Sequence, residues 1–156
     1  MVDLVRLRAP LAAALAALVV AGCGGHAATK QDVIARGNAI CAGALRDLRA
    51  TPTPAGGSLS GLATYLQSVL PTLQREASNL QALPRPATDR ALLNQYLSAI
   101  RLSQASDRAL LAAARRGDQT AVNQALAQLQ ANPASSLAAR YGLAQCGSAA
   151  GTAVPR

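Results

Sequence analysis

Apolar residues recur at steps of three and four from residue 29 to residue 141, and this spacing limits the fold more than any other feature. Such steps place side chains on one face of an α-helix. The sequence has no Phe and no Trp but is rich in Ala and Leu, which favours close-packed helices over sheets. We therefore predict an all-α fold, an up-and-down bundle of about four helices. The clearest face is Leu92, Leu93, Tyr96, Leu97, Ile100, Ser103, Leu110, Leu111 and Ala114.

Capping residues, prolines and glycines divide this pattern into segments. Ser, Thr and Asp begin helices by accepting backbone hydrogen bonds, and glycine ends them. Gly142 fits a left-handed helix end, with Leu143 folding back as its apolar contact. The expected helices cover residues 29–50, 58–83, 88–116, 118–131 and 133–141.

Proline positions leave two local questions open. Pro71 lies inside the second helix, where a proline removes one backbone hydrogen bond and costs about 3 kcal/mol, so we expect a kink or a break. Asn132 and Pro133 suit a helix restart, although a kink is the alternative. For the third helix we expect Thr88 as the N-cap, with Asp89 in the first turn.

The first 22 residues have the composition of an export signal. An apolar run at residues 11–22 follows Arg6 and Arg8. A helix needs roughly 20 apolar residues to cross a bilayer, so a permanent membrane span is disfavoured. An ordinary secretory signal, cleaved after Ala21 or later, is one interpretation.

The other interpretation depends on residues 20–23, Val-Ala-Gly-Cys. This ending resembles the lipobox of bacterial lipoprotein precursors, in which Leu or Val and two small residues precede a modified cysteine. The resemblance implies cleavage between Gly22 and Cys23, a lipid on Cys23 such as a palmitate-bearing diacylglyceryl group, and an extracytoplasmic location at the cell membrane. We favour this lipoprotein interpretation.

The resulting domain organisation is simple. We expect a removed signal peptide at 1–22, a lipidated tether at 23–28, a helical bundle at 29–146 and a flexible tail at 147–156. Removing the signal leaves 134 residues, enough for one domain.

Cysteine usage agrees with export. Lipidation of Cys23 leaves Cys41 and Cys146 as a pair in a compartment that tolerates disulfides. A bridge closing about 100 residues is worth roughly 4.7 kcal/mol in the chain-entropy model. We predict this disulfide; the alternative is that Cys41 is a small buried apolar residue and Cys146 a thiol near a disordered end.

The C-terminal cysteine also belongs to a short motif. Residues 141–147 read Tyr-Gly-Leu-Ala-Gln-Cys-Gly, and a second cysteine lies on the first expected helix. From Cys41 to Cys146 the chain resembles small Ala- and Arg-rich helical lipoproteins of actinobacteria and related lineages. Most of these have no assigned function, so the resemblance implies fold and placement only.

The chain is basic, with a formal net charge of +8. Removing the signal takes away two arginines and one aspartate, so the charge becomes +7. A cationic domain at a surface is attracted to anionic lipid or acidic wall polymers. The alternative is that the arginines only solvate helix faces, because they are scattered and never form a run of five. We expect no nucleic-acid binding, since there are too few aromatic residues for base stacking.

The residue types that enzymes use are scarce. His26 is the only histidine and falls in the tether, and Glu76 is the only glutamate. Hydrolytic triads, paired carboxylates, ferritin-like metal sites and haem attachment all need more. We therefore expect no enzymatic activity, no metal and no cofactor.

Asp107 is the one polar residue in the bundle that we single out. It falls among the apolar positions of segment 88–116, and a carboxylate facing a core is costly unless it is paired or protonated. It is a candidate functional group; alternatively it reaches Ser103, a tyrosine, an arginine of another helix, or water.

Two functions remain. The first, which we prefer, is a non-catalytic binding or scaffolding module of the cell envelope, anchored through Cys23 and contacting an envelope protein, anionic lipid or a wall polymer. The second is a carrier that holds a lipid or other small apolar ligand inside the bundle. An internal cavity would favour the carrier, and a filled core with an exposed patch would favour the scaffold.

Overall fold

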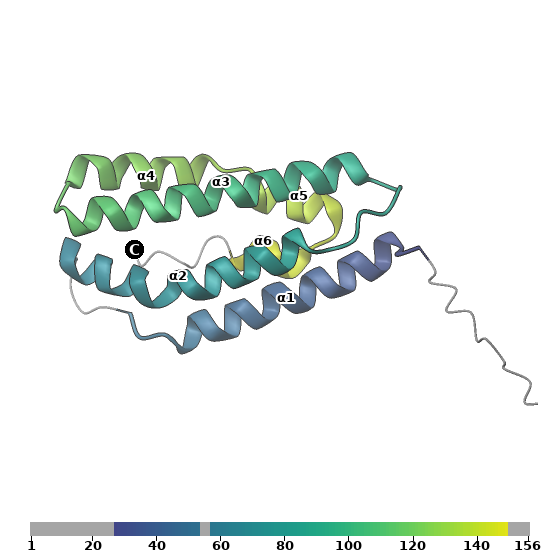
Figure 1. Cartoon of the computed structure of the whole chain (residues 1–156), viewed down its shortest axis with the longest axis horizontal. Helices are drawn as coiled ribbons and strands as arrows, with labels where there is room; N and C mark the ends of the chain where they lie inside the picture. Colours follow the sequence, from purple (N-terminus) through teal and green to yellow (C-terminus); the bar gives the residue numbers. More distant parts are fainter. Residues whose placement is uncertain (1–26, 54–56, 150–156) are drawn as a thin grey trace, which may run out of the picture.

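The protein folds into an all-α bundle, as predicted (Figure 1). The structure is a computed structural model that describes residues 27–53 and 57–149. Within these ranges the helices are α1 (Lys30–Ala50), α2 (Leu59–Gln81), α3 (Arg90–Arg115), α4 (Gln119–Ala131), α5 (Ala134–Tyr141) and α6 (Ala144–Ala149).

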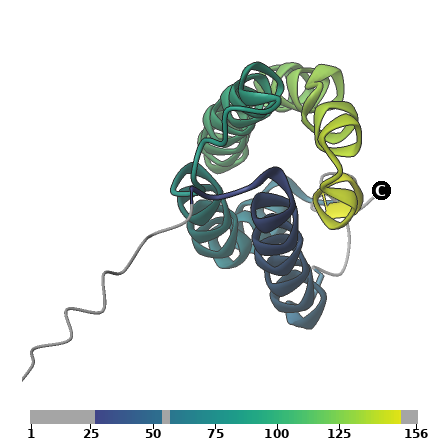
Figure 2. The ribbon, with the colours of Figure 1, turned by 90° about the vertical axis from the view of Figure 1, so that its right-hand side faces the viewer.

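The first four helices run up and down, and the last two return the chain to α1. Helix α2 packs between α1 and α3, and α4 packs on the other side of α3. Helix α5 contacts α3, while α6 contacts both α5 and α1. Viewed from one end, the helices surround a shared interior (Figure 2). Helix α6 therefore lies beside the first helix, as expected for this topology.

Buried side chains form two hydrophobic clusters along the length of the bundle. The disulfide-end cluster joins α1, α2, α3, α5 and α6 and includes Val33, Cys41, Leu80, Leu93, Tyr96, Tyr141 and Leu143. The turn-end cluster, near the connection between α3 and α4, includes Leu66, Val69, Leu110, Ala113, Val122 and Ala125. Two neighbouring clusters in one bundle make a single domain.

Helix α1 begins where its capping residues predict. The Oγ1 of Thr29 accepts from the Asp32 backbone N–H at 3.2 Å, and the Asp32 carboxylate accepts from the Thr29 backbone N–H at 2.9 Å. This reciprocal capping box satisfies two otherwise unpaired donors. The hydrogen bonds from Thr29 lower the pKa of Asp32.

The expected cap of α3 is wrong. Asp89, not Thr88, occupies the N-cap position, with a left-handed φ of 56° and no side-chain capping bond. Its carboxylate instead pairs with the Lys30 ammonium at 2.6 Å. An ion pair between the starts of α1 and α3 therefore takes the place of a side-chain capping bond. Such a pair cannot be predicted from the residues around Asp89 alone.

The two proline questions have different answers. Helix α2 continues through Pro71, so the break does not occur; Pro71 is exposed, where water can satisfy the freed carbonyl. At Asn132 and Pro133 the helix does restart. The Asn132 side chain accepts from the Ala134 N–H and donates to the Ala99 carbonyl, both at 2.9 Å.

The end of α5 follows the expected pattern, but the next helix was not expected. Gly142 ends α5 with φ 105°, and Leu143 folds back to complete burial. Helix α6 then extends to residue 149, into the segment 147–156 that we predicted to be a flexible tail. The predicted signal peptide at 1–22, and Cys23, lie outside the described residues.

Candidate functional site

The predicted disulfide joins α1 to α6. Cys41 and Cys146 are bonded, with their sulfur atoms 2.00 Å and their Cα atoms 5.0 Å apart, across 105 positions of sequence. Both cysteines are buried. The disulfide expected from the odd cysteine count is therefore confirmed. It holds α6 against α1.

Hydrogen bonds and packing reinforce this junction. The Asn38 amide donates to the Gly142 carbonyl at 3.5 Å, and its oxygen accepts from the Gln145 N–H at 2.9 Å. Leu143 packs into the space left by Gly37, so that a Cβ there would lie 2.5 Å from the leucine Cδ2. The junction thus joins the first helix of the bundle to residues 142–146 through a disulfide, two hydrogen bonds and close packing.

Glu76 is the most perturbed acidic group, and sequence reasoning did not identify it as a site. It lies in a hollow of about 220 Å³ between α1 and α2, together with Asp47 and Arg75. Burial raises its pKa to about 7. Arg75 does not neutralise it, because its guanidinium bonds to Asp47 at 3.5 Å and to Thr72 at 3.2 Å. No hydrogen bond or ion pair to Glu76 is present among the described residues.

A sequence signal for Glu76 did exist. It follows Leu73 by three residues and precedes Leu80 by four, which are the steps of the apolar stripe of α2. The same reasoning that singled out Asp107 therefore applies to Glu76.

Asp107 is half-buried on α3, as its position in the stripe indicated. Burial raises its pKa to about 6, and the neighbouring Arg108 opposes part of that rise. In the ranges that the structure covers, none of the side-chain partners we considered forms a hydrogen bond with it. The hydroxyl of its buried neighbour Ser106 donates to the Gln128 Oε1 at 3.3 Å and not to Asp107.

The two carboxyl groups do not form a shared site. Glu76 comes from α2 and Asp107 from α3, and Asp107 does not line the hollow at Glu76. Along α2, Glu76 lies between Leu73, which packs against the turn-end cluster, and Leu80 of the disulfide-end cluster. Along α3, Asp107 lies between Ile100, which packs against the disulfide-end cluster, and Leu110 of the turn-end cluster. A single carboxyl group protonating near neutral pH can accept or donate one hydrogen bond to a ligand in its hollow.

A second hollow, of about 530 Å³, lies on the outer face between α3 and α5. Its lining includes Ala91, Ser98, Leu102, Pro133 and Leu137. Leu102 is 62% exposed and is the only exposed large hydrophobic residue in the described ranges. This hollow offers an apolar contact to a partner side chain.

The described part of the chain holds neither a metal-ligand cluster nor a membrane-spanning helix. Among these residues no group of three His, Cys, Asp or Glu side chains is placed to hold a metal ion. No helix in the same ranges combines the length and apolar character needed to cross a bilayer.

No protein-family model matches the chain, and no curated protein or solved structure is significantly similar to it.

Proposed function

We propose that this protein is a lipid-anchored extracytoplasmic protein whose helical bundle acts as a non-catalytic binding or scaffolding module of the cell envelope. Two observations support the location. Residues 20–23 resemble a lipobox, and the bond between Cys41 and Cys146 is of the kind that persists in oxidising compartments.

The observation that carries the binding role is the exposed apolar hollow at Leu102. Hydrophobic side chains fill the interior in two clusters, whereas Leu102 is left open to solvent on the outside of α3. An apolar surface site with a polar rim is suited to a protein partner. This arrangement favours a solid bundle that presents its surface over a carrier that opens.

The anchor is tested by metabolic labelling with a fatty-acid probe in a bacterial host. The wild-type chain is expected to be labelled and cleaved, and Cys23→Ser to be neither. Cys146→Ser is the matched control, because it removes a cysteine and the disulfide but keeps the lipobox. Label on Cys23→Ser, or none on the wild type, would refute the anchor.

The binding surface is tested by site-specific photo-crosslinking in intact envelopes. A photoreactive residue in place of Leu102 is expected to give a discrete adduct, and the same residue at exposed Gln124 on α4 is not. Equal crosslinking at both positions would show that the hollow has no special role.

A further inference from the structure

Three arginines of α3 and three glutamines of α2 share one register across the seam between these antiparallel helices. The arginines are spaced seven residues apart, and so are the glutamines. Seven residues are close to two helical turns, so each set lies on one line. Position by position, the opposed pairs are Gln81 with Arg101, Gln74 with Arg108, and Gln67 with Arg115.

We call these three opposed glutamine–arginine pairs the ladder. Hydrogen bonds are present at both of its ends. Arg101 donates to the Gln81 Oε1 at 3.1 Å and to the Ser98 Oγ at 2.9 Å. With the Gln67 amide oxygen facing α3, it accepts from Arg115 Nε and Nη2 at 3.1 and 3.0 Å. The guanidinium groups of Arg101 and Arg115 are thereby held over the seam, whereas no hydrogen bond joins Gln74 to Arg108 among the described residues.

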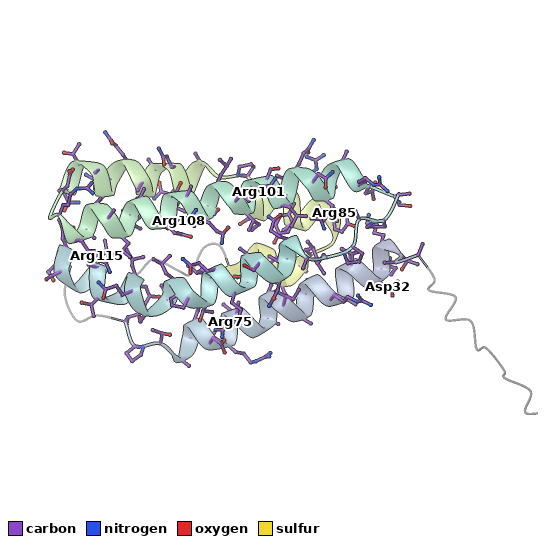
Figure 3. The ribbon with its side chains drawn as sticks, in the orientation of Figure 1. Asp32, Arg75, Arg85, Arg101, Arg108 and Arg115 are labelled. Atoms are coloured by element: carbon purple, nitrogen blue, oxygen red, sulfur yellow. A yellow bond between two sulfur atoms is a disulfide. The ribbon has the colours of Figure 1, made fainter. Side chains whose placement is uncertain are left out.

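Arg90 extends the row toward the start of α3. It precedes Arg101 by eleven residues, about three turns, and so lies on the same face. At 1.5 Å per residue, the row from Arg90 to Arg115 is about 38 Å long. Figure 3 shows Arg101, Arg108 and Arg115 in one line along α3. We call Arg90, Arg101, Arg108 and Arg115 the arginine row; all four are exposed.

The charge of the arginine row is offset only in part by its neighbours. Helices α2 and α3 contain only two acidic residues, Glu76 and Asp107, and both are half-buried. Glu76 lines the hollow that α2 forms with α1. Glutamate at the three glutamine positions would place a negative charge opposite each guanidinium, whereas glutamine leaves the positive charge in place and, at Gln81 and Gln67, also orients the guanidinium. The row therefore presents a line of positive charge that only Asp107, beside Arg108, partly offsets.

We propose that the arginine row lies against the anionic headgroups of the membrane to which the protein is anchored, a proposal that rests on the proposed function. A straight row along the bundle matches a flat, extended surface. Each arginine near an anionic leaflet strengthens partitioning about fivefold. The three tyrosines of the chain are all buried, so this face offers no aromatic ring for stacking on nucleic-acid bases.

The position of the anchor agrees with this orientation. Lys30 at the start of α1 pairs with Asp89, the residue before Arg90. Six residues, 24–29, separate Cys23 from Lys30, and the seven residue steps between them reach at most roughly 25 Å when extended. A lipid on Cys23 would therefore hold the Arg90 end of the row close to the headgroups.

The test measures vesicle binding of the full chain carrying Cys23→Ser, which has no acyl group. Vesicles of phosphatidylcholine alone are compared with vesicles that also contain phosphatidylglycerol. The ratio of the two partition coefficients cancels the contribution of the apolar residues 11–22, which all variants share. Added salt should reduce the ratio by screening.

Two triple variants with identical net charge provide the comparison. The ladder variant carries Gln67→Glu, Gln74→Glu and Gln81→Glu; the control variant carries Gln119→Glu, Gln124→Glu and Gln130→Glu at exposed positions of α4. The ladder variant is expected to lower the anionic-to-neutral ratio at least tenfold, toward a hundredfold if each arginine contributes fully. The control is expected to lower it less than threefold. If the ladder variant fails to fold, the variant with Arg101→Gln, Arg108→Gln and Arg115→Gln carries the same expectation.

Three results would overturn the proposal. Equal losses in both triple variants would show that only net charge matters. An anionic-to-neutral ratio near one in the chain that carries Cys23→Ser alone would show that there is no preference for anionic lipid, even if Cys23 of the wild type proves to be acylated. Ladder-dependent binding of soluble polyphosphate without vesicle preference would assign the row to a polymer. Conversely, a high ratio in the Cys23→Ser chain, together with a wild-type chain that the fatty-acid probe never labels, would refute the anchor and leave the charged surface intact.

Discussion

The two ends of the bundle are built differently. At the disulfide end, α1 meets α6, a segment about a hundred residues away in sequence, and a covalent bond joins them. At the turn end, α3 and α4 are consecutive, with Asp118 capping α4 through a 2.9 Å bond from the Ala121 N–H. One end depends on long-range closure and the other on local geometry.

This difference reflects loop entropy. Bringing distant segments together costs more than closing a short turn, and a disulfide removes part of that cost from the unfolded chain. The turn-end helices need no such bond, because their connection already keeps them close. We therefore expect perturbations at the disulfide end to have larger effects than those at the turn end.

The largest expected effect is loss of the disulfide. Replacing Cys41 and Cys146 by Ala should lower the free energy of unfolding by about 3–5 kcal/mol, because the loop that they close is long. Guanidinium denaturation of the variant, compared with the oxidised wild type, measures the loss.

The location of the loss distinguishes the two ends. Hydrogen exchange of the variant should show protection falling first in α5 and α6, while α4 and the second half of α3 retain theirs. The wild type treated with a reductant is the control and should behave alike. A uniform loss of protection along the chain would mean that the bundle opens as one unit. The disulfide end and the turn end would then not differ in local stability.

Smaller effects are expected from the carboxyl groups between the clusters. The folded-state pKa of Glu76 is raised from its ordinary 4.5 to about 7, and that of Asp107 from 3.8 to about 6, mainly by burial. A raised carboxyl pKa favours folding at low pH, and this contribution is lost as pH rises through the folded value. Unfolding free energy should therefore increase by about 1–3 kcal/mol from pH 8 to pH 5. Asp32, whose pKa is lowered, acts oppositely but only below about pH 4.

The matched variant is Glu76→Gln, which keeps the shape of the side chain and removes its titration. It should be more stable than the wild type at pH 8 and should show a weaker pH dependence. Asp47→Asn is the control, since this exposed carboxylate of the same hollow is already paired with Arg75. Identical pH profiles for Glu76→Gln and the wild type would show that Glu76 is solvated.

Much of this architecture was predictable from the sequence. Periodic apolar residues predicted the helices, and the odd cysteine count predicted the pairing of Cys41 with Cys146. Burial of one helix face requires apolar residues at helical spacing, so the pattern can be seen in the sequence. Cysteine pairing follows from the number of cysteines once an oxidising compartment is expected. The restart at Asn132 and the left-handed Gly142 followed from local backbone chemistry.

The features that sequence reasoning missed depend on tertiary register. The Asp89 side chain pairs with Lys30, a residue 59 positions away, and makes no capping bond to α3. The arginines of α3 look scattered in sequence, and only the antiparallel offset of α2 and α3 aligns them with glutamines. Helix α6 forms where Gly147 and small residues suggested a frayed tail, because Cys146 and Leu143 hold it against α1. Such features require knowing which helices are neighbours.

The finest test compares one glycine at each end, both with positive φ. Gly142→Ala should cost about 2 kcal/mol, because φ is 105° and the new Cβ would lie 2.9 Å from the Ile34 Cδ1. Gly117→Ala should cost only about 1 kcal/mol, since φ is 69° and no atom lies within 4 Å of the new Cβ. The difference in unfolding free energy combines tighter packing at Gly142 with a larger backbone strain, because a φ of 105° lies farther from the left-handed minimum than a φ of 69°. Pairing Gly142→Ala with Ile34→Val should recover part of its loss by shortening the opposing side chain, and equal costs for the two glycines would show that both ends tolerate change equally.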